Sequence, residues 1–145
     1  MIKLNFPDFK FNLKNKDNKP HIFDILRKKF ILLTPEEWVR QHVINFLISY
    51  NIPKNHIAVE KKIIINKMTK RFDLVVHDRN GNILLLVECK APNVKINQKV
   101  FDQTSIYNTH LKSKYLMITN GLNHFYFKVD SKAKTYNFVK NFPLK

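Results

Sequence analysis

The sequence predicts an α/β fold in which helices flank a mixed central β-sheet. Three observations lead to this prediction: a helix that begins at Thr34, a pair of strands over 71–90, and a helix over 97–112 that leads into a strand at 115–120. Because two strands joined by a crossover helix lie parallel in one sheet, parallel and antiparallel neighbours are both expected. The predicted order is α-β-β-β-α-β, followed by a C-terminal β-hairpin.

The first thirty residues are expected to form an N-terminal arm. Residues 1–20 are rich in Lys and Asn, and Phe6, Phe9 and Phe11 alternate along them. This pattern predicts a segment that adds an edge strand or packs on the surface. Residues 21–30 are typical of a short amphipathic helix or a turn.

The first helix has a clear start signal. Thr34 is a good N-cap, Pro35 suits the first helical position, and Glu37 completes a capping box. The expected apolar stripe is Val39, Val43, Phe46, Leu47 and Tyr50. The helix should end before Pro53.

A strand is predicted over 56–66, and the segment RFDLVVHDRNGNILLLVECK (71–90) then predicts a hairpin. Asn80-Gly81 indicates a two-residue type I′ loop, which would fix the register. In that register Asp73 lies opposite Glu88 and Arg71 lies opposite Lys90. Since side chains alternate along a strand, these four share one face.

Two directly opposed carboxylates repel each other, so their charge needs compensation. A divalent cation would supply it, because hard cations take carboxylate oxygens. The alternative is a set of diagonal salt bridges, from Arg71 to Glu88 and from Asp73 to Lys90.

The second half of the chain completes the predicted sheet. The inner face of the helix over 97–112 consists of Val100, Phe101, Thr104, Tyr107 and Leu111. A short apolar strand follows at 115–120 and is closed by Gly121. Residues 124–130 and 135–142 then predict the final hairpin around Ser-Lys-Ala-Lys.

The length of 145 residues suits a single domain, divided into the arm (1–30), the core (31–121) and the C-terminal hairpin (122–145). A net charge of +15 favours a polyanionic partner, with nucleic acid first and an anionic membrane surface second. No apolar run approaches the length of a membrane span, and the N-terminus lacks a signal-peptide pattern. Cys89 is the only cysteine, which fits a reducing cytoplasm.

Asp73, Glu88 and Lys90 have the chemistry of a phosphodiesterase site. Two carboxylates can hold Mg²⁺, or Mn²⁺ in its place, which polarises the scissile phosphate. The Lys90 ammonium could orient or deprotonate a water molecule and neutralise charge on phosphate oxygens. The backbone carbonyl of Cys89 could be a further metal ligand.

Four helix residues extend this candidate site. Glu36 lies on the apolar stripe of the first helix, where it either serves the site or is a first-turn acid favoured by the helix dipole. Arg40 could pair with Glu36 or reach a phosphate. Gln103 and Tyr107 share one face of the second helix and either line the same cleft or belong to the core and its polar margin.

Several ordered segments resemble the PD-(D/E)XK nuclease superfamily, and most closely the N-terminal nuclease domain of type I restriction enzyme R subunits in its small stand-alone form. The matching segments are LTPEEWVRQ (33–41), RFDLVV (71–76), LLLVECKAP (84–92), DQTSIYN (102–108) and YLMITNG (115–121). The superfamily's Pro before the Asp is replaced by Phe72.

The resemblance implies a restriction-endonuclease-like core and assigns roles residue by residue. Asp73 and Glu88 would be metal ligands, Lys90 catalytic, Glu36 the helix carboxylate and Gln103 the glutamine of the Q-x-x-x-Y motif. The chain lacks the P-loop glycine pattern of an ATP-driven translocase, so a complete restriction enzyme is excluded.

The leading hypothesis is a Mg²⁺-dependent endonuclease domain that acts on DNA in the cytoplasm, with Arg40, Arg71 and Tyr107 as nucleic-acid contacts. RNA remains an alternative substrate, and a homodimer or accessory subunits are alternative partners. The second hypothesis is a non-catalytic nucleic-acid-binding module, and the third is an interaction module that docks an acidic protein.

Overall fold

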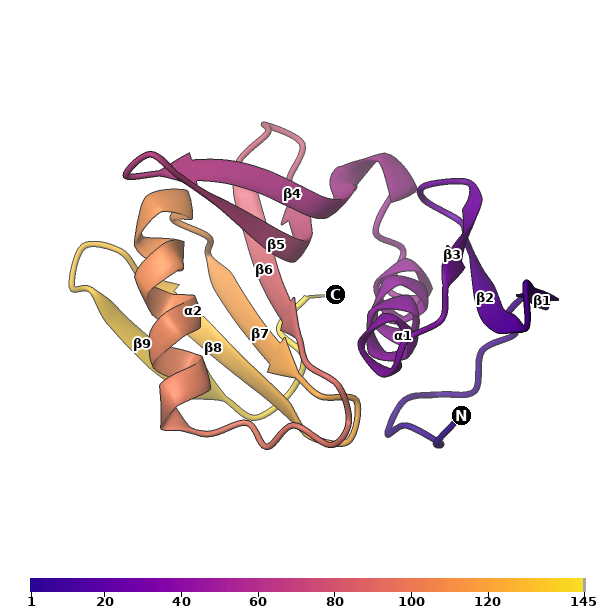
Figure 1. Ribbon diagram of the computed structural model, residues 1–145. Coiled ribbons are helices and arrows are strands. Elements are labelled where there is room, and N and C mark those ends of the chain that lie inside the picture. Colours follow the sequence, from indigo (N-terminus) through magenta and orange to yellow (C-terminus); the bar gives the residue numbers. More distant parts are fainter. Residues whose placement is uncertain (145) are drawn as a thin grey trace.

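The computed structural model describes residues 1–144 and confirms an α/β fold with a mixed sheet. Strands β4 to β9 form one sheet in the order β4-β5-β6-β7-β8-β9, and β1 to β3 form a separate antiparallel sheet. Figure 1 shows α1 between these two sheets, with α2 on the other face of the six-stranded sheet. Within residues 1–144, no helix is long and apolar enough to cross a membrane.

The N-terminal segment differs from the prediction. Residues 13–32 form three strands, β1 (Leu13–Lys16), β2 (Lys19–Asp24) and β3 (Lys29–Leu32), so 13–20 does not add an edge strand to the main sheet. Within 21–30 there is no helix, but the alternative expectation of a turn holds for residues 25–28. Ile22 and Asp24 are both buried, with the period of two that a strand requires. The expected boundary after residue 30 falls inside β3, and Lys145 lies outside the described residues.

The first twelve residues pack on the surface, as one of the two expectations stated. Leu4 is buried, and the Asn5 amide donates to the Gly121 carbonyl at 2.8 Å. Trp38 on α1 donates from Nε1 to the Ile2 carbonyl at 2.8 Å. Residues 1–12, called the N-terminal arm from here on, therefore cover the outer side of α1.

Helix α1 (Pro35–Ser49) begins where it was predicted, and its cap is half of a capping box. The Glu37 amide donates to Thr34 Oγ1 at 3.0 Å. The Glu37 side chain does not return to the cap, because it is buried and bonded to Arg27, Arg40 and Gln41. The helix contributes Val39, Val43, Ile44 and Leu47 to the core.

Strands β4 (Ile57–Ile65), β5 (Met68–His77) and β6 (Ile83–Cys89) are antiparallel neighbours, and a single 3₁₀ turn (Lys54–His56) leads into them. A two-residue loop joins β4 to β5 at Asn66-Lys67, where both residues have positive φ, 50° and 64°. A type I′ loop requires this geometry.

The predicted two-residue loop at Asn80-Gly81 is wrong. His77 pairs with Ile83, and residues 78–82 form the loop, in which Asp78 Oδ1 accepts the Asn80 and Asn82 amides. A bulge next to Val76 then shifts the register, so that Leu74 pairs with Val87 as expected. The predicted register at the acidic end therefore holds, although the loop differs.

The two faces of the sheet have separate cores. The α1 side holds Leu74, Val76, Leu85, Val87 and Cys89, and the α2 side holds Phe72, Val75, Leu86, Leu116 and Ile118. Phe72 was expected on the first of these faces. Glu60 on β4 lies opposite Asp73 on β5, but the two residues do not pair, and the φ of Glu60 is 52°. This irregularity in the ladder breaks the alternation of side chains around Phe72.

Helix α2 (Gln98–Leu111) and strand β7 (Tyr115–Thr119) confirm the parallel crossover, since β6 and β7 pair in parallel. Asn97 caps α2, and Val100, Phe101, Thr104, Tyr107 and Leu111 face the sheet or are buried, as predicted. Strands β8 (His124–Asp130) and β9 (Thr135–Val139) form the expected C-terminal hairpin and extend the same sheet.

Candidate functional site

Two acidic side chains from neighbouring strands meet beside the end of β6. Asp73 on β5 and Glu88 on β6 are almost fully buried and are hydrogen-bonded to each other. Burial and the adjacent Asp73 carboxylate raise the pKa of Glu88 to about 9. The raised pKa favours the protonated form of Glu88, which can donate to the Asp73 carboxylate.

Protein donors hold Asp73 in its ionised form. Arg40 Nη2 donates to Oδ1 at 2.5 Å, and the Cys89 amide donates to Oδ2 at 2.8 Å. Burial alone would raise the pKa of Asp73, but the hydrogen bond with Glu88 and the Arg40 guanidinium lower it below its ordinary value. The pair therefore carries one proton and one negative charge.

Arg40 links this pair to a buried network of charges that reaches the N-terminal sheet. Its Nη1 donates to Glu37 Oε1 at 2.6 Å, and Arg27 and Gln41 donate to Glu37 Oε2. Asp24, in turn, accepts hydrogen bonds from Arg27 and Gln41. Only 7 % of Arg40 is exposed, and within residues 1–144 its Nε has no hydrogen-bond partner.

Lys90 and Glu36 lie around the acidic pair. Lys90 follows Glu88 by two residues, and its positive charge lowers the pKa of both Glu36 and Glu88, against the larger effect of burial. Burial and the Asp73 carboxylate raise the pKa of Glu36, whose side chain is about half exposed. Glu36 thus faces the site, whereas Glu37 belongs to the buried network.

The other predicted residues lie farther out. Arg71 is 55 % exposed and stands 3.9 Å from Glu60, and Gln103 is exposed on α2. Tyr107 packs in the α2-side core, with Lys70 Nζ 4.7 Å from its ring centre. Arg40 is taken up by carboxylates. The nucleic-acid roles of Arg40, Arg71 and Tyr107 and the catalytic role of Gln103 stay predictions.

The predicted diagonal salt bridges are wrong. Among the ion pairs of the described residues, neither Arg71–Glu88 nor Asp73–Lys90 occurs, and the partner of Asp73 is Arg40. No local pattern indicated Glu60, which forms ion pairs with Arg27, Arg40 and Arg71, because its place opposite Asp73 depends on its positive φ.

The family model described as "Type I restriction enzyme R protein N terminus (HSDR_N)" matches residues 35–143. The chain belongs to this family. The match covers α1, all six strands of the main sheet and every residue of the site described above, from Glu36 to Lys90. It confirms the resemblance drawn from the sequence.

A solved structure supports the fold of this R-protein N-terminal family. A fragment of a proposed HsdR subunit of a type I restriction enzyme from Vibrio vulnificus YJ016 aligns with a TM-score of 0.53 and 21 % identity. The alignment covers 77 % of this chain and 24 % of that one, so the chain spans about a quarter of the length of that relative.

A second structure, a proposed nuclease of the DUF820 group from Anabaena variabilis ATCC 29413, aligns with a TM-score of 0.48 and 9 % identity over 88 % of this chain and 80 % of that one. A comparison with curated proteins gave no match.

The donor set of this R-protein N-terminal domain fits a hard divalent cation. Among residues 1–144, no group of three or more His, Cys, Asp or Glu side chains is placed to hold a metal ion, and the acidic pair offers two carboxyl groups. Mg²⁺ is commonly bound by one or two carboxylates, with water and substrate phosphate completing its shell. Each carboxylate oxygen has two lone pairs, so Asp73 can bind a cation while Arg40 and Cys89 hold it.

Proposed function

We propose that this domain hydrolyses DNA phosphodiester bonds with Mg²⁺ as its cofactor. The observation that carries the proposal is the contact between Asp73 and Glu88, with Glu36 linked to Asp73 through Arg40 and with Lys90 two residues after Glu88, on a chain of net charge +15. Paired carboxylates next to an ammonium are the usual means of metal-assisted phosphoryl chemistry. The family match supports a restriction-enzyme or nuclease type of domain.

The residues have distinct tasks in this proposal. Asp73 and Glu88 would hold Mg²⁺, together with the Cys89 carbonyl, and the bound ion supplies Lewis acidity at the scissile phosphate. The Lys90 ammonium neutralises charge that develops on the phosphate oxygens. Glu36, half exposed and with a raised pKa, takes the proton of the attacking water. Arg40 orients Asp73.

One observation favours the second hypothesis, a non-catalytic nucleic-acid-binding module. Both Asp73 oxygens already accept protein hydrogen bonds, and Glu88 carries a proton, so the pair is satisfied by the protein alone. Such a domain would bind DNA with a strong salt dependence but would not cleave it.

A metal titration separates these two functions. Mg²⁺ or Mn²⁺ is added to the wild type, Glu88→Ala and Lys90→Ala, and both the unfolding midpoint and plasmid nicking are measured. Metal should raise the midpoint of the wild type and of Lys90→Ala but not of Glu88→Ala, since only an intact ligand pair binds the ion.

Nicking should require Glu88 and Lys90 but not Lys62, an exposed lysine on β4 that serves as the charge-matched control. Wild-type protein that is stabilised by neither ion and leaves plasmid intact would support the binding module. Cleavage by Lys90→Ala at the wild-type rate would overturn the proposed mechanism.

The proposal places the domain in the cytoplasm, where a single buried thiol stays reduced and DNA is present. Its partner is DNA, with RNA as the alternative substrate. Sequence recognition and translocation would come from accessory subunits, or a second copy of the chain would supply a second site.

A further inference from the structure

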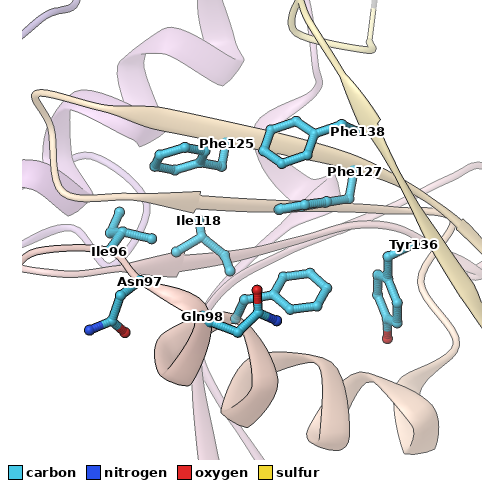
Figure 2. A pocket seen from close by; sticks show the side chains of 9 residues that line it. Ile96, Asn97, Gln98, Ile118, Phe125, Phe127, Tyr136 and Phe138 are labelled. Carbon is cyan, nitrogen blue, oxygen red and sulfur yellow. The ribbon is translucent and has the colours of Figure 1, made fainter.

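An aromatic groove lies on the α2 face of the sheet and is separate from the charged network around Arg40. It has a volume of about 370 Å³. Its apolar lining consists of Ile96 before α2, Phe101 from α2, Ile118 from β7, Phe125 and Phe127 from β8, and Tyr136 and Phe138 from β9. Figure 2 shows the rings of Phe125, Phe127, Phe138 and Tyr136 along one side of the groove, with α2 on the other.

The strand register places one end of this groove next to Glu88. Glu88 on β6 pairs with Ile118 on β7, and Ile118 pairs with Phe125 on β8. Paired residues share a face of the sheet, and neighbouring strands are about 4.8 Å apart, so Phe125 lies about 10 Å from Glu88 along this row. One end of the groove therefore lies on the same face of the sheet as Glu88, two strands away from it.

One ring of the groove, Phe138, is largely exposed, and it lies against rings that are buried or partly buried in the α2-side core. Phe138 is 70 % exposed on the edge strand β9, and its ring centre lies 4.8 Å from that of Phe127 and 6.0 Å from that of Phe125. Phe101 adds a ring 4.8 Å from Phe127. A largely exposed ring that continues a partly buried aromatic cluster indicates a contact surface.

The polar surroundings of the groove fit a nucleic acid. None of the described residues that line it is acidic, and its polar members are Asn97, Gln98 and the Tyr136 hydroxyl. Asn97 and Gln98 start α2, where helix amide groups favour an anion. Lys95 and Lys99, both exposed, flank these two residues in the sequence.

We propose that this groove binds an unpaired nucleobase, so that the preferred substrate presents a single-stranded segment beside the Asp73–Glu88 pair. Aromatic rings stack on every base, and side-chain amides can bond base edges. This inference rests on the proposed nuclease function. A second copy of the chain is a weaker occupant, because two molecules of net charge +15 repel each other.

The test measures binding without cleavage. A short fluorescein-labelled oligothymidine and its abasic counterpart are titrated in EDTA against the wild type, Phe138→Ala and Phe138→Trp, with anisotropy as the readout. Ile64→Ala is the matched control, since Ile64 is an exposed apolar residue on β4, the opposite edge strand.

The wild type should bind oligothymidine more tightly than the abasic strand. Phe138→Ala should weaken oligothymidine binding roughly 5- to 150-fold, the range expected for one stacked base, and should abolish the preference over the abasic strand. Ile64→Ala should leave both affinities unchanged. Phe138→Trp should restore binding, with quenching of the new indole fluorescence by oligothymidine alone.

Equal binding of oligothymidine by the wild type and Phe138→Ala would overturn the proposal. So would a wild-type dimer that becomes monomeric in Phe138→Ala without any change in oligonucleotide affinity. Nicking by the wild type, measured separately with Mg²⁺, decides the catalytic function. The groove proposal can therefore be wrong while the catalytic function is right, and the catalytic function can be wrong while the groove proposal is right.

Discussion

Glu88 is 8 % exposed and lies against an ionised Asp73, so its ionisation would bring two negative charges together in a poorly solvated place. The protein avoids this by keeping a proton on Glu88 and an arginine on Asp73. A divalent cation could take over both tasks, since it would compensate both carboxylates at once.

Replacement of Glu88 by Gln should stabilise the metal-free domain at alkaline pH. The pKa of Glu88 is about 9 in the folded state and 4.5 as the ordinary value in the unfolded chain. Between these two pKa values the folded state binds more protons than the unfolded chain, so wild-type stability falls as pH rises from about 4.5 to 9. Glu88→Gln removes this loss. In EDTA at pH 8 it should raise the free energy of unfolding by at least about 1.4 kcal/mol, the value of one pKa unit, and by little at pH 5.

Urea denaturation at the two pH values checks this expectation. Glu36→Gln is the control, because the Glu36 pKa is raised in the same direction on a side chain that is about half exposed, and its effect should be smaller. A gain for Glu88→Gln that is the same at pH 5 and pH 8 would contradict a proton on Glu88.

Arg40 should be the most costly residue of the charged network to remove. Arg40→Gln would remove the guanidinium that pairs with both Asp73 and Glu37 and would leave these two buried carboxylates near each other. Removal of one partner of a buried ion pair costs about 3–5 kcal/mol. Arg40→Lys should recover only part of this loss, because an ammonium cannot bridge two carboxylates with a planar fork.

A double-mutant cycle with Asp73→Asn isolates the Arg40–Asp73 contact, again by urea denaturation. The double variant should be more stable than the sum of the single changes predicts, with a coupling of about 0.5–3 kcal/mol. Strict additivity would mean that Arg40 acts on the fold through Glu37 alone.

At the scale of elements, two glycines have similar φ angles but different surroundings. Their replacement by Ala therefore distinguishes the cost of a left-handed backbone from the cost of a steric clash. Gly81 (φ 81°) has no described atom within 4 Å of a built Cβ, whereas at Gly121 (φ 87°) a Cβ would stand 2.8 Å from Leu4 Cδ2 and 3.1 Å from Val39 Cγ2. Gly81→Ala should cost about 1–2 kcal/mol, the price of a left-handed alanine. Gly121→Ala should cost more and should loosen the N-terminal arm from α1.

Thermal unfolding measures the first effect, and amide exchange at Asn5 measures the second, since this amide donates to the Gly121 carbonyl. Faster exchange at Asn5 is expected in Gly121→Ala and not in Gly81→Ala. Equal exchange in the two variants would show that the arm is held elsewhere.

Elements with a strong local signal were predictable from the sequence. The Thr34 cap, the 3.6-residue period of α2 and the crossover into β7 all depend on neighbours in the chain, and each lies where it was expected. The Asn80-Gly81 loop was wrong because Asp78 captures two amides and forms a wider loop. A bulge beside Val76 then restored the register by a means that no local pattern reveals.

The site was predictable to the extent that it depends on strand alternation. The predicted strand register placed Asp73 opposite Glu88, and Lys90 follows two residues after Glu88 on the same face of the predicted strand. The partnership of Arg40 with Asp73, and the buried link through Glu37 to Asp24, join segments far apart in the chain. Such contacts depend on how α1 and the N-terminal sheet pack, so helix periodicity gave only the local pair of Arg40 with Glu36.

At the scale of the whole molecule, the net charge and the aromatic groove should contribute to binding in separable ways. Counterion release makes the affinity for single strands fall with salt, with a slope of about −0.7 per phosphate contact on a log–log plot. About four contacts would thus weaken oligothymidine binding about 50-fold between 50 and 200 mM salt. Stacking on Phe138 involves no ion release, so it should change the affinity at every salt concentration by the same factor and leave the slope unchanged.

Salt titrations in EDTA of the wild type, Phe138→Ala and Lys99→Ala test this separation. Phe138→Ala should give a parallel line at lower affinity, because it removes a base contact and no charge. Lys99→Ala should reduce the slope by about 0.7, as expected for one lost phosphate contact at the start of α2. A reduced slope in Phe138→Ala would mean that the groove acts by aligning the strand's phosphates, and an unchanged slope in Lys99→Ala would place the backbone on another face.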